Sequence, residues 1–146
     1  MVKIPLFKGN RLGFERSLVT LSIKYGNLPS FFAEALVDTG CPFTVISESK
    51  MKKTRIPYSD KPTSYSNVQV GNIIMELKDL GVCEISFRDE NNKIVKINQQ
   101  IFVGVPITKG YLSQELPSFL GQDILKNHHI SIMNNKSGSD FLFIED

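Results

Sequence analysis

One acidic residue, Asp38, stands where an apolar, strand-like pattern is interrupted and then resumes. Leu36-Val37 precede it, Thr39-Gly40 follow it, and Phe43-Thr44-Val45-Ile46 return to an apolar stretch that favours β-structure. A carboxylate between two core segments is no ordinary surface charge, because burial of an ion needs strong compensation and shifts its affinity for a proton. The glycine allows a tight turn and the close approach of another chain. The pattern favours a carboxylate placed for acid–base chemistry over its alternative, an aspartate-capped turn without chemistry.

A second segment, Phe119-Leu120-Gly121-Gln122-Asp123-Ile124-Leu125, follows near the end of the chain. With Asp38-Thr39-Gly40 it resembles the retropepsin family, the single-domain aspartic proteases related to the retroviral enzymes, in which an apolar-apolar-Gly-x-x-x-Leu segment follows the catalytic turn. The resemblance covers residues 16–145. It implies a mainly β fold: a small closed β-barrel of the acid-protease type with one helix in its C-terminal half, active as a symmetric homodimer. Pro42 and Gln122 depart from the pattern, because retroviral members carry a substrate-binding Asp and its Arg partner there.

The resemblance also implies a mechanism, with Asp38 as the catalytic carboxylate and Thr39 and Gly40 completing the catalytic turn. Two carboxylates share one proton in this family, because both cannot ionise at such close range. No other aspartate of the chain is followed by Thr-Gly or Ser-Gly, so the second carboxylate must come from a second copy across a twofold axis. We expect an endopeptidase in which two Asp38 carboxylates, one per protomer, activate a water molecule. Its expected partners are a second copy and an extended polypeptide substrate, with no cofactor and no metal ion.

The residues that cover the substrate are expected in a hairpin within Tyr65–Met75 and in the floor beside the catalytic turn. Gly-Asn suits a tight hairpin turn, and Val68, Val70 and Ile73 alternate as a covering flap would. An ordinary surface hairpin is the equally weighted alternative. The expected substrate contacts are Cys41, Val70, Gly71, Asn72 and Ile73.

A second function of another class stays open: a catalytically silent module of the same fold that dimerises or binds peptides. A fold does not guarantee an activity. The intact Asp38-Thr39-Gly40 argues against this alternative, whereas Cys41 and a hairpin tip with little glycine leave it open.

The elements that must position Asp38 are mostly strands. Period-two alternation predicts a strand over 18–25 and a second over Phe31–Val37, joined by the Gly26-Asn27 turn. Another hairpin is expected from Cys83 through the polar run 89–93 and back along 94–103. The terminal run Phe141–Ile144 is either a strand of the chain's own barrel or part of a sheet shared by the dimer.

Two helices are expected. Ser47 can cap a short helix through Met51. The longer candidate is Leu116–Lys126, with Pro117 in its first turn. Many short strands with few helices favour a small barrel or sandwich.

Composition sets the remaining limits. The 146 residues fit one domain, 1–146, with its own core. A net charge of +2, from 17 basic and 15 acidic residues, gives no reason to expect nucleic acid or a membrane as partner. Without an apolar run of signal-peptide or membrane-span length, the chain is expected to be soluble and cytoplasmic. Cys41 and Cys83 fit this compartment, although one disulfide between them stays possible.

Overall fold

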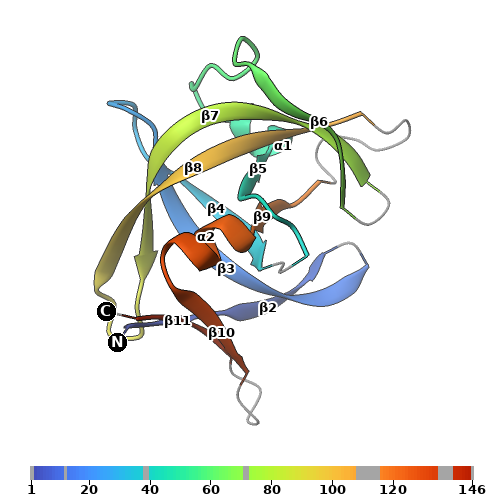
Figure 1. Cartoon of the computed structure of the whole chain (residues 1–146). Helices are drawn as coiled ribbons and strands as arrows, with labels where there is room; N and C mark the ends of the chain where they lie inside the picture. Colours follow the sequence, from blue (N-terminus) through green and yellow to red (C-terminus); the bar gives the residue numbers. More distant parts are fainter. Residues whose placement is uncertain are drawn as a thin grey trace.

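The computed structural model describes residues 2–11, 13–37, 40–70, 73–107, 116–134 and 140–145, and this part of the chain is mainly β, as predicted. It forms eleven strands and two short helices (Figure 1). The elements are β1 (Val2–Pro5), β2 (Phe7–Arg11), β3 (Phe14–Lys24), β4 (Phe31–Val37), β5 (Val45–Ser47), α1 (Glu48–Met51), β6 (Thr63–Val70), β7 (Ile73–Arg88), β8 (Ile94–Pro106), β9 (Ser118–Leu120), α2 (Gln122–Asn127), β10 (Ile130–Asn134) and β11 (Asp140–Ile144).

The larger sheet has eight strands in the order β2-β3-β4-β9-β5-β8-β7-β6. The long strand β3 pairs with β2 through its first half, with β4 through its second half, and with β7 over its last three residues. This additional pairing, Ser22–Lys24 against 84–86, brings a distant part of the sheet back onto β3. The result is the strongly curved sheet of Figure 1, where β7 and β8 arch over β3 and β4.

A smaller sheet of three strands, in the order β1-β11-β10, joins the two ends of the chain. β1 and β10 flank β11 on either side, so both edges of this strand are paired within the same chain. The termini lie close together in Figure 1 as a result. Of the two alternatives for Phe141–Ile144, the structure shows a strand of the chain's own sheet.

The predicted alternation decides which face of each long strand is buried. Val19, Leu21 and Ile23 of β3 are buried, as are Ile85 and Phe87 of β7. The first hydrophobic cluster joins these residues to the small sheet and to α2. A second cluster lies where the β6–β7 hairpin packs on the ends of β4, β5 and β9. Both predicted hairpins, β3–β4 and β7–β8, are confirmed.

The expected helix over Leu116–Lys126 is wrong in its first half. Residues 118–120 form β9, which pairs in parallel with β4 and also meets β5, and the helix begins only at Gln122. Non-local pairing with two buried strands thus outweighs the local helical pattern, and Pro117 lies before a strand. The helix after Ser47 is confirmed: α1 begins at Glu48, and the Ser47 hydroxyl accepts a hydrogen bond from the Lys50 N–H. The structure therefore has a helix in each half of the chain, not one.

The two cysteines are free and buried. Cys83 is a core residue of β7, as predicted. Burial raises the pKa of the Cys83 thiol to about 11, and the nearby negative charge of Asp79 adds to this effect. Among the described residues, no helix is both long enough and apolar enough to cross a membrane.

Candidate active site

The chain leaves the core at the carboxyl end of β4 and turns at the expected catalytic residues. Leu36, one residue before the strand's end, is buried opposite Phe119 of β9, and the last residue, Val37, is half-buried opposite Leu120. Gly40 is exposed in a turn, and Cys41 is fully buried. Asp38 and Thr39 lie outside the described residues, and the parallel pair of β4 and β9 fixes the strand that leads to them.

The segment after the turn is held against the start of α2 by its backbone. The N–H of Gln122 donates to the Cys41 carbonyl oxygen at 2.8 Å, and the N–H of Asp123 donates to the Pro42 carbonyl oxygen at 3.1 Å. Gly121 makes this approach possible, since a Cβ there would lie 2.2 Å from the Phe43 carbonyl oxygen. Only glycine fits at this crossing. The departures at Pro42 and Gln122 leave the packing intact, because these contacts use main-chain atoms.

Asp123 and Thr44 form a buried polar link beside the turn. The Asp123 carboxylate accepts hydrogen bonds from the Thr44 N–H at 3.0 Å and from the Thr44 hydroxyl at 2.7 Å. It also accepts from the Ile124 N–H and from the Gln99 side-chain amide. The Thr44 hydroxyl accepts in turn from the Gly121 N–H at 3.2 Å. This network ties the segment after the catalytic turn to the helix that follows β9.

Sequence reasoning did not assign these two residues a role. Thr44 is one hydroxyl within an otherwise apolar stretch, and Asp123 follows a glycine at a helix start. A buried hydroxyl needs a partner, and a carboxylate is favourable in the first turn of a helix. Those two patterns were the available clues, but only the fold places the residues together.

The structure brings three of the expected substrate-covering residues into one apolar cluster. Cys41 and Ile73 are 0% and 2% exposed, and Val70 packs against the same cluster. Val70 and Ile73 face each other as the last paired residues of the β6–β7 hairpin. Gly71 and Asn72, the expected tip, lie between them and outside the described residues. The Cys41 thiol donates to the Phe43 carbonyl oxygen at 3.2 Å, so its hydrogen points to the main chain.

Aromatic side chains connect the hairpin to the segment after the turn. The rings of Phe43 and Tyr65 stack with their centroids 4.4 Å apart, and Phe102 meets both rings edge-on. Such contacts add about 0.5–1.5 kcal/mol per pair beyond the burial of area. The β6 strand is thereby anchored beside the candidate site.

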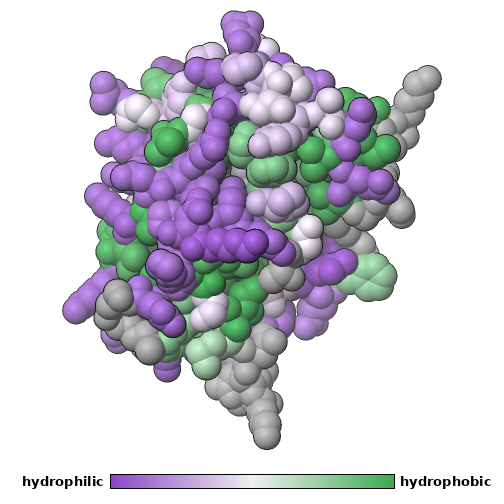
Figure 2. Space-filling view, viewed as in Figure 1, coloured by the Kyte–Doolittle hydropathy of each residue, from purple (hydrophilic) through white to green (hydrophobic). Residues whose placement is uncertain are grey.

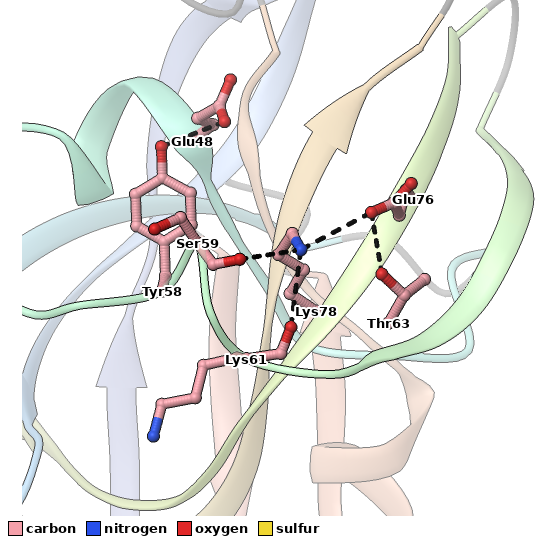
Figure 3. Close-up of polar contacts among 7 residues, drawn as sticks. All are labelled: Glu48, Tyr58, Ser59, Lys61, Thr63, Glu76 and Lys78. Atoms are coloured by element: carbon pink, nitrogen blue, oxygen red, sulfur yellow. Dashed lines mark hydrogen bonds and ion pairs between the residues drawn. The ribbon is translucent and has the colours of Figure 1, made fainter.

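The base of the same hairpin is pinned by Lys78 of β7 (Figure 3). Its ammonium group donates to the carbonyl oxygens of Ser59 and Lys61, at 3.2 and 3.4 Å, and lies 3.7 Å from a Glu76 carboxylate oxygen. The Thr63 hydroxyl donates to the same Glu76 oxygen at 2.8 Å. The loop before β6 and the two hairpin strands are therefore held together at the end farthest from the tip.

A hydrogen bond from Tyr58 to Glu48 fastens this loop to α1 (Figure 3). Burial raises the pKa of the Tyr58 hydroxyl, and the bond to Glu48 and the charge of that carboxylate raise it further. In the view of Figure 2, one of several groups of hydrophobic residues lies at the upper right, where Figure 1 places the β6–β7 hairpin. The hairpin combines a polar base with apolar residues near its end, Val68 and Val70, which pack against the second cluster.

Within the described residues, no three His, Cys, Asp or Glu side chains lie close enough together to hold a metal ion. Next to residues 38 and 39 the site presents the end of β4, a floor made by β9, and the β6–β7 hairpin packed above it.

Comparison with known proteins supports the architecture. No protein-family model and no curated protein matches the sequence. A retropepsin-like aspartic protease from Rickettsia conorii has a similar structure, with a TM-score of 0.54 and 14% identity over 97% of this chain and 90% of that chain. Basic 7S globulin from soybean matches with a TM-score of 0.52 and 10% identity, over 99% of this chain and 50% of that chain. The retroviral protease-like domain of Ddi1 from Leishmania major matches with a TM-score of 0.43 and 10% identity. From the parallel β4–β9 pair and the hairpin above it, together with the similarity to the Rickettsia conorii protease, we conclude that the chain has a retropepsin-like fold.

Proposed function

We propose that this protein is an aspartic endopeptidase whose catalytic pair is formed by Asp38 from each of two identical chains. The observation that carries the proposal is the junction at Val37, where a core strand of a retropepsin-like fold ends directly before Asp38-Thr39-Gly40. The chain has one such junction, so a complete pair needs a second copy. A closed barrel and a symmetric homodimer are parts of the same proposal.

The chemistry follows from the proximity of two carboxylates. Two such groups at close range cannot both ionise, so they hold one proton between them. The charged carboxylate takes a proton from a water molecule as the water attacks the scissile carbonyl carbon, and the protonated one donates to the carbonyl oxygen. Proton transfer to the amide nitrogen then releases the amine. No covalent bond to the enzyme forms in this sequence.

The substrate would bind as an extended chain between the floor and the β6–β7 hairpin, which acts as a flap. Main-chain hydrogen bonds to the flap give affinity, and alternate side chains enter pockets on either face. We assign the flap to Val70, Gly71, Asn72 and Ile73, and the floor to Cys41. Cys41 and Ile73 are buried in the same hydrophobic cluster. The flap must therefore lift before a peptide can replace the contacts of these two residues.

The test is cleavage of an unfolded protein substrate by the wild type, by Asp38→Asn and by Asp60→Asn. The first substitution keeps the size of the side chain and removes its charge. The second makes the same change at an exposed aspartate in the turn before β6. The assay runs between pH 3 and 7 and over a rising protein concentration, because a weak dimer is silent when dilute.

Activity in the wild type and in Asp60→Asn, with none in Asp38→Asn, is the expected result. Activity that persists in Asp38→Asn would show that another group or a contaminant cleaves the substrate. Silence in all three proteins, with a dimer shown by sedimentation, would favour the silent dimerisation or peptide-binding module instead.

A further inference from the structure

A cavity lies on the outer face of the large sheet, away from the carboxyl end of β4. It has a volume of about 560 Å³, within the usual range for small-molecule sites. Its floor is formed by β3 and β7, where these strands pair, and its sides come from β1, β2, β4 and β8. Of the expected catalytic and flap residues, those that the structure describes (Gly40, Cys41, Val70 and Ile73) do not line it.

Strand register explains why the surface is hollow here. Phe32, Ser22, Ser86 and Lys96 lie directly opposite one another on four neighbouring strands, in that order from β4 to β8. Directly opposite residues project from the same face of a sheet. Two small hydroxyl side chains therefore form the middle of this row, between a large ring at one end and a lysine at the other. Three strand spacings separate the ends, or about 14 Å.

Apolar side chains line the cavity on both sides of β3. Phe32 of β4 lies on one side, Phe7 of β2 lies on the other side, where β7 also pairs, and Ile4 and Phe87 complete the apolar lining. Ile4 and Phe87 are buried, whereas Phe7 and Phe32 are 39% and 64% exposed. Large exposed apolar side chains around a hollow mark a binding surface more than a solvated one.

The lining also carries positive charge. Lys24 of β3, Arg88 of β7 and Lys96 of β8 line the cavity, with Glu84 as the one acidic residue in the described lining. The Glu84 carboxylate lies 3.7 Å from the Lys96 ammonium group, and the Arg88 guanidinium donates to the neutral Asn92 side chain. Three cations and one anion leave an excess of two positive charges around the cavity.

We propose that this cavity binds an amphipathic carboxylate: an apolar tail against Phe32 at one end of the row, and an anionic head group against Lys96 and Arg88 toward the other. A bound carboxylate would accept charge-assisted hydrogen bonds from these cations while the tail covers the exposed Phe32 ring. The site is separate from the catalytic turn and does not depend on the proposed protease activity.

An extended peptide is the less suitable occupant. Peptides that bind sheets commonly add a strand to an open edge. At the floor of the cavity, β3 pairs with both β4 and β7, and β7 pairs with both β3 and β8. A strand could therefore add only at the outer edges of β4 or β8 and not over the floor. Recognition over the floor must come from side chains, which suits a compact ligand.

Isothermal titration calorimetry with dodecanoate, below its micelle concentration, tests the proposal on the full chain. Dodecyltrimethylammonium has the same tail and the opposite charge, so it tests the head group. Lys96→Glu and Phe32→Ala alter the two ends of the cavity, and Glu84→Gln removes the competing carboxylate. Matched controls are Lys126→Glu, the same charge reversal on an exposed lysine of α2, and Phe14→Ala, at a ring that is 66% exposed and outside the cavity.

We expect one dodecanoate per chain and little binding of the cationic probe. Lys96→Glu should weaken binding by about tenfold or more, as for the loss of a hydrogen bond to a charged group, and Phe32→Ala severalfold. Glu84→Gln should tighten it, and the two controls should match the wild type. Amide chemical shifts of Ser22 and Ser86 should move on titration.

Three results would each overturn the proposal. The first is an absence of saturable dodecanoate binding, including the case in which a peptide with acidic and aromatic residues binds instead. The second is equal binding in every variant and control, which would mean nonspecific association. The third is equal affinity for the cationic probe, which would remove the role of Lys96 and Arg88.

Discussion

Replacing Asp123 with alanine should cost more stability than any ordinary surface change, because its carboxylate satisfies two buried donors of Thr44. Thr44 is 0% exposed, so water cannot replace the acceptor for its N–H or its hydroxyl. Each buried donor left without a partner costs about 1–3 kcal/mol. The Ile124 N–H also loses its acceptor, whereas the Gln99 side-chain amide keeps a hydrogen bond to the Gln100 carbonyl oxygen; both residues are buried.

The free energy of unfolding should therefore fall by about 3–4 kcal/mol in Asp123→Ala. This is a large part of the net stability of a typical domain, which is ~5–15 kcal/mol. It should appear as a lower midpoint of urea unfolding at unchanged slope and as a fall in Tm of about 10 °C. Asp123→Asn should cost roughly half as much, since the amide keeps one acceptor oxygen. Asp60→Ala, at an exposed aspartate, is the control.

A loss below about 1 kcal/mol for Asp123→Ala, or an equal loss for Asp60→Ala, would refute this reasoning. Either result would mean that Thr44 finds another acceptor and that the link between the turn and α2 is weak. If the reasoning is right, Asp123→Ala should also lose cleavage activity at temperatures where it is still folded, because the segment after the turn is then poorly positioned.

Three further changes test other parts of the account. Gly121→Ala should destabilise the fold by about 3 kcal/mol, because its methyl group meets the Phe43 main chain. Gly9→Ala meets only side-chain atoms, of Leu18 and Arg11, and should cost less in the same urea assay; equal losses would contradict the steric argument. Lys78→Met should speed amide hydrogen exchange in the loop before β6 while exchange in β3 stays slow, and unchanged exchange in that loop would mean that the lysine does not pin it. Burial raises the pKa of Cys83 to about 11, above that of an unfolded thiol, so the unfolded chain binds fewer protons than the folded chain between about pH 9 and 11. The free energy of unfolding should therefore fall in this range by up to about 1.4 kcal/mol per pH unit. Cys83→Ala should flatten this fall, and an unchanged pH profile would mean that another group causes it.

Local patterns predicted the parts of the fold that depend on neighbouring residues. The alternation of apolar residues in β3 and β7, with turn residues after each, was enough to place both hairpins, because antiparallel strands joined by a short turn pair with their neighbour. The cap at Ser47 was found for the same reason, since one side chain and one nearby N–H define it.

Pairing between distant segments is what the sequence did not show. Residues 118–120 look helical by their apolar spacing, yet they become a strand because β4 and β5 lie on either side of them. The Thr44–Asp123 link and the cavity beside Ser22 and Ser86 arise in the same way, from strands whose register is set by the whole sheet. At the site itself, the Asp38-Thr39-Gly40 motif identified the turn but not the contacts that support it.

The proposed catalytic pair is tested most directly by mixing wild-type protein with Asp38→Asn at constant total concentration, after exchange of subunits. If each active site needs Asp38 from two chains, an equal mixture should keep about a quarter of the wild-type activity, because only that share of random dimers carries two intact chains. Retention of about half of the activity would mean that each chain works alone, and that result would contradict the shared catalytic pair.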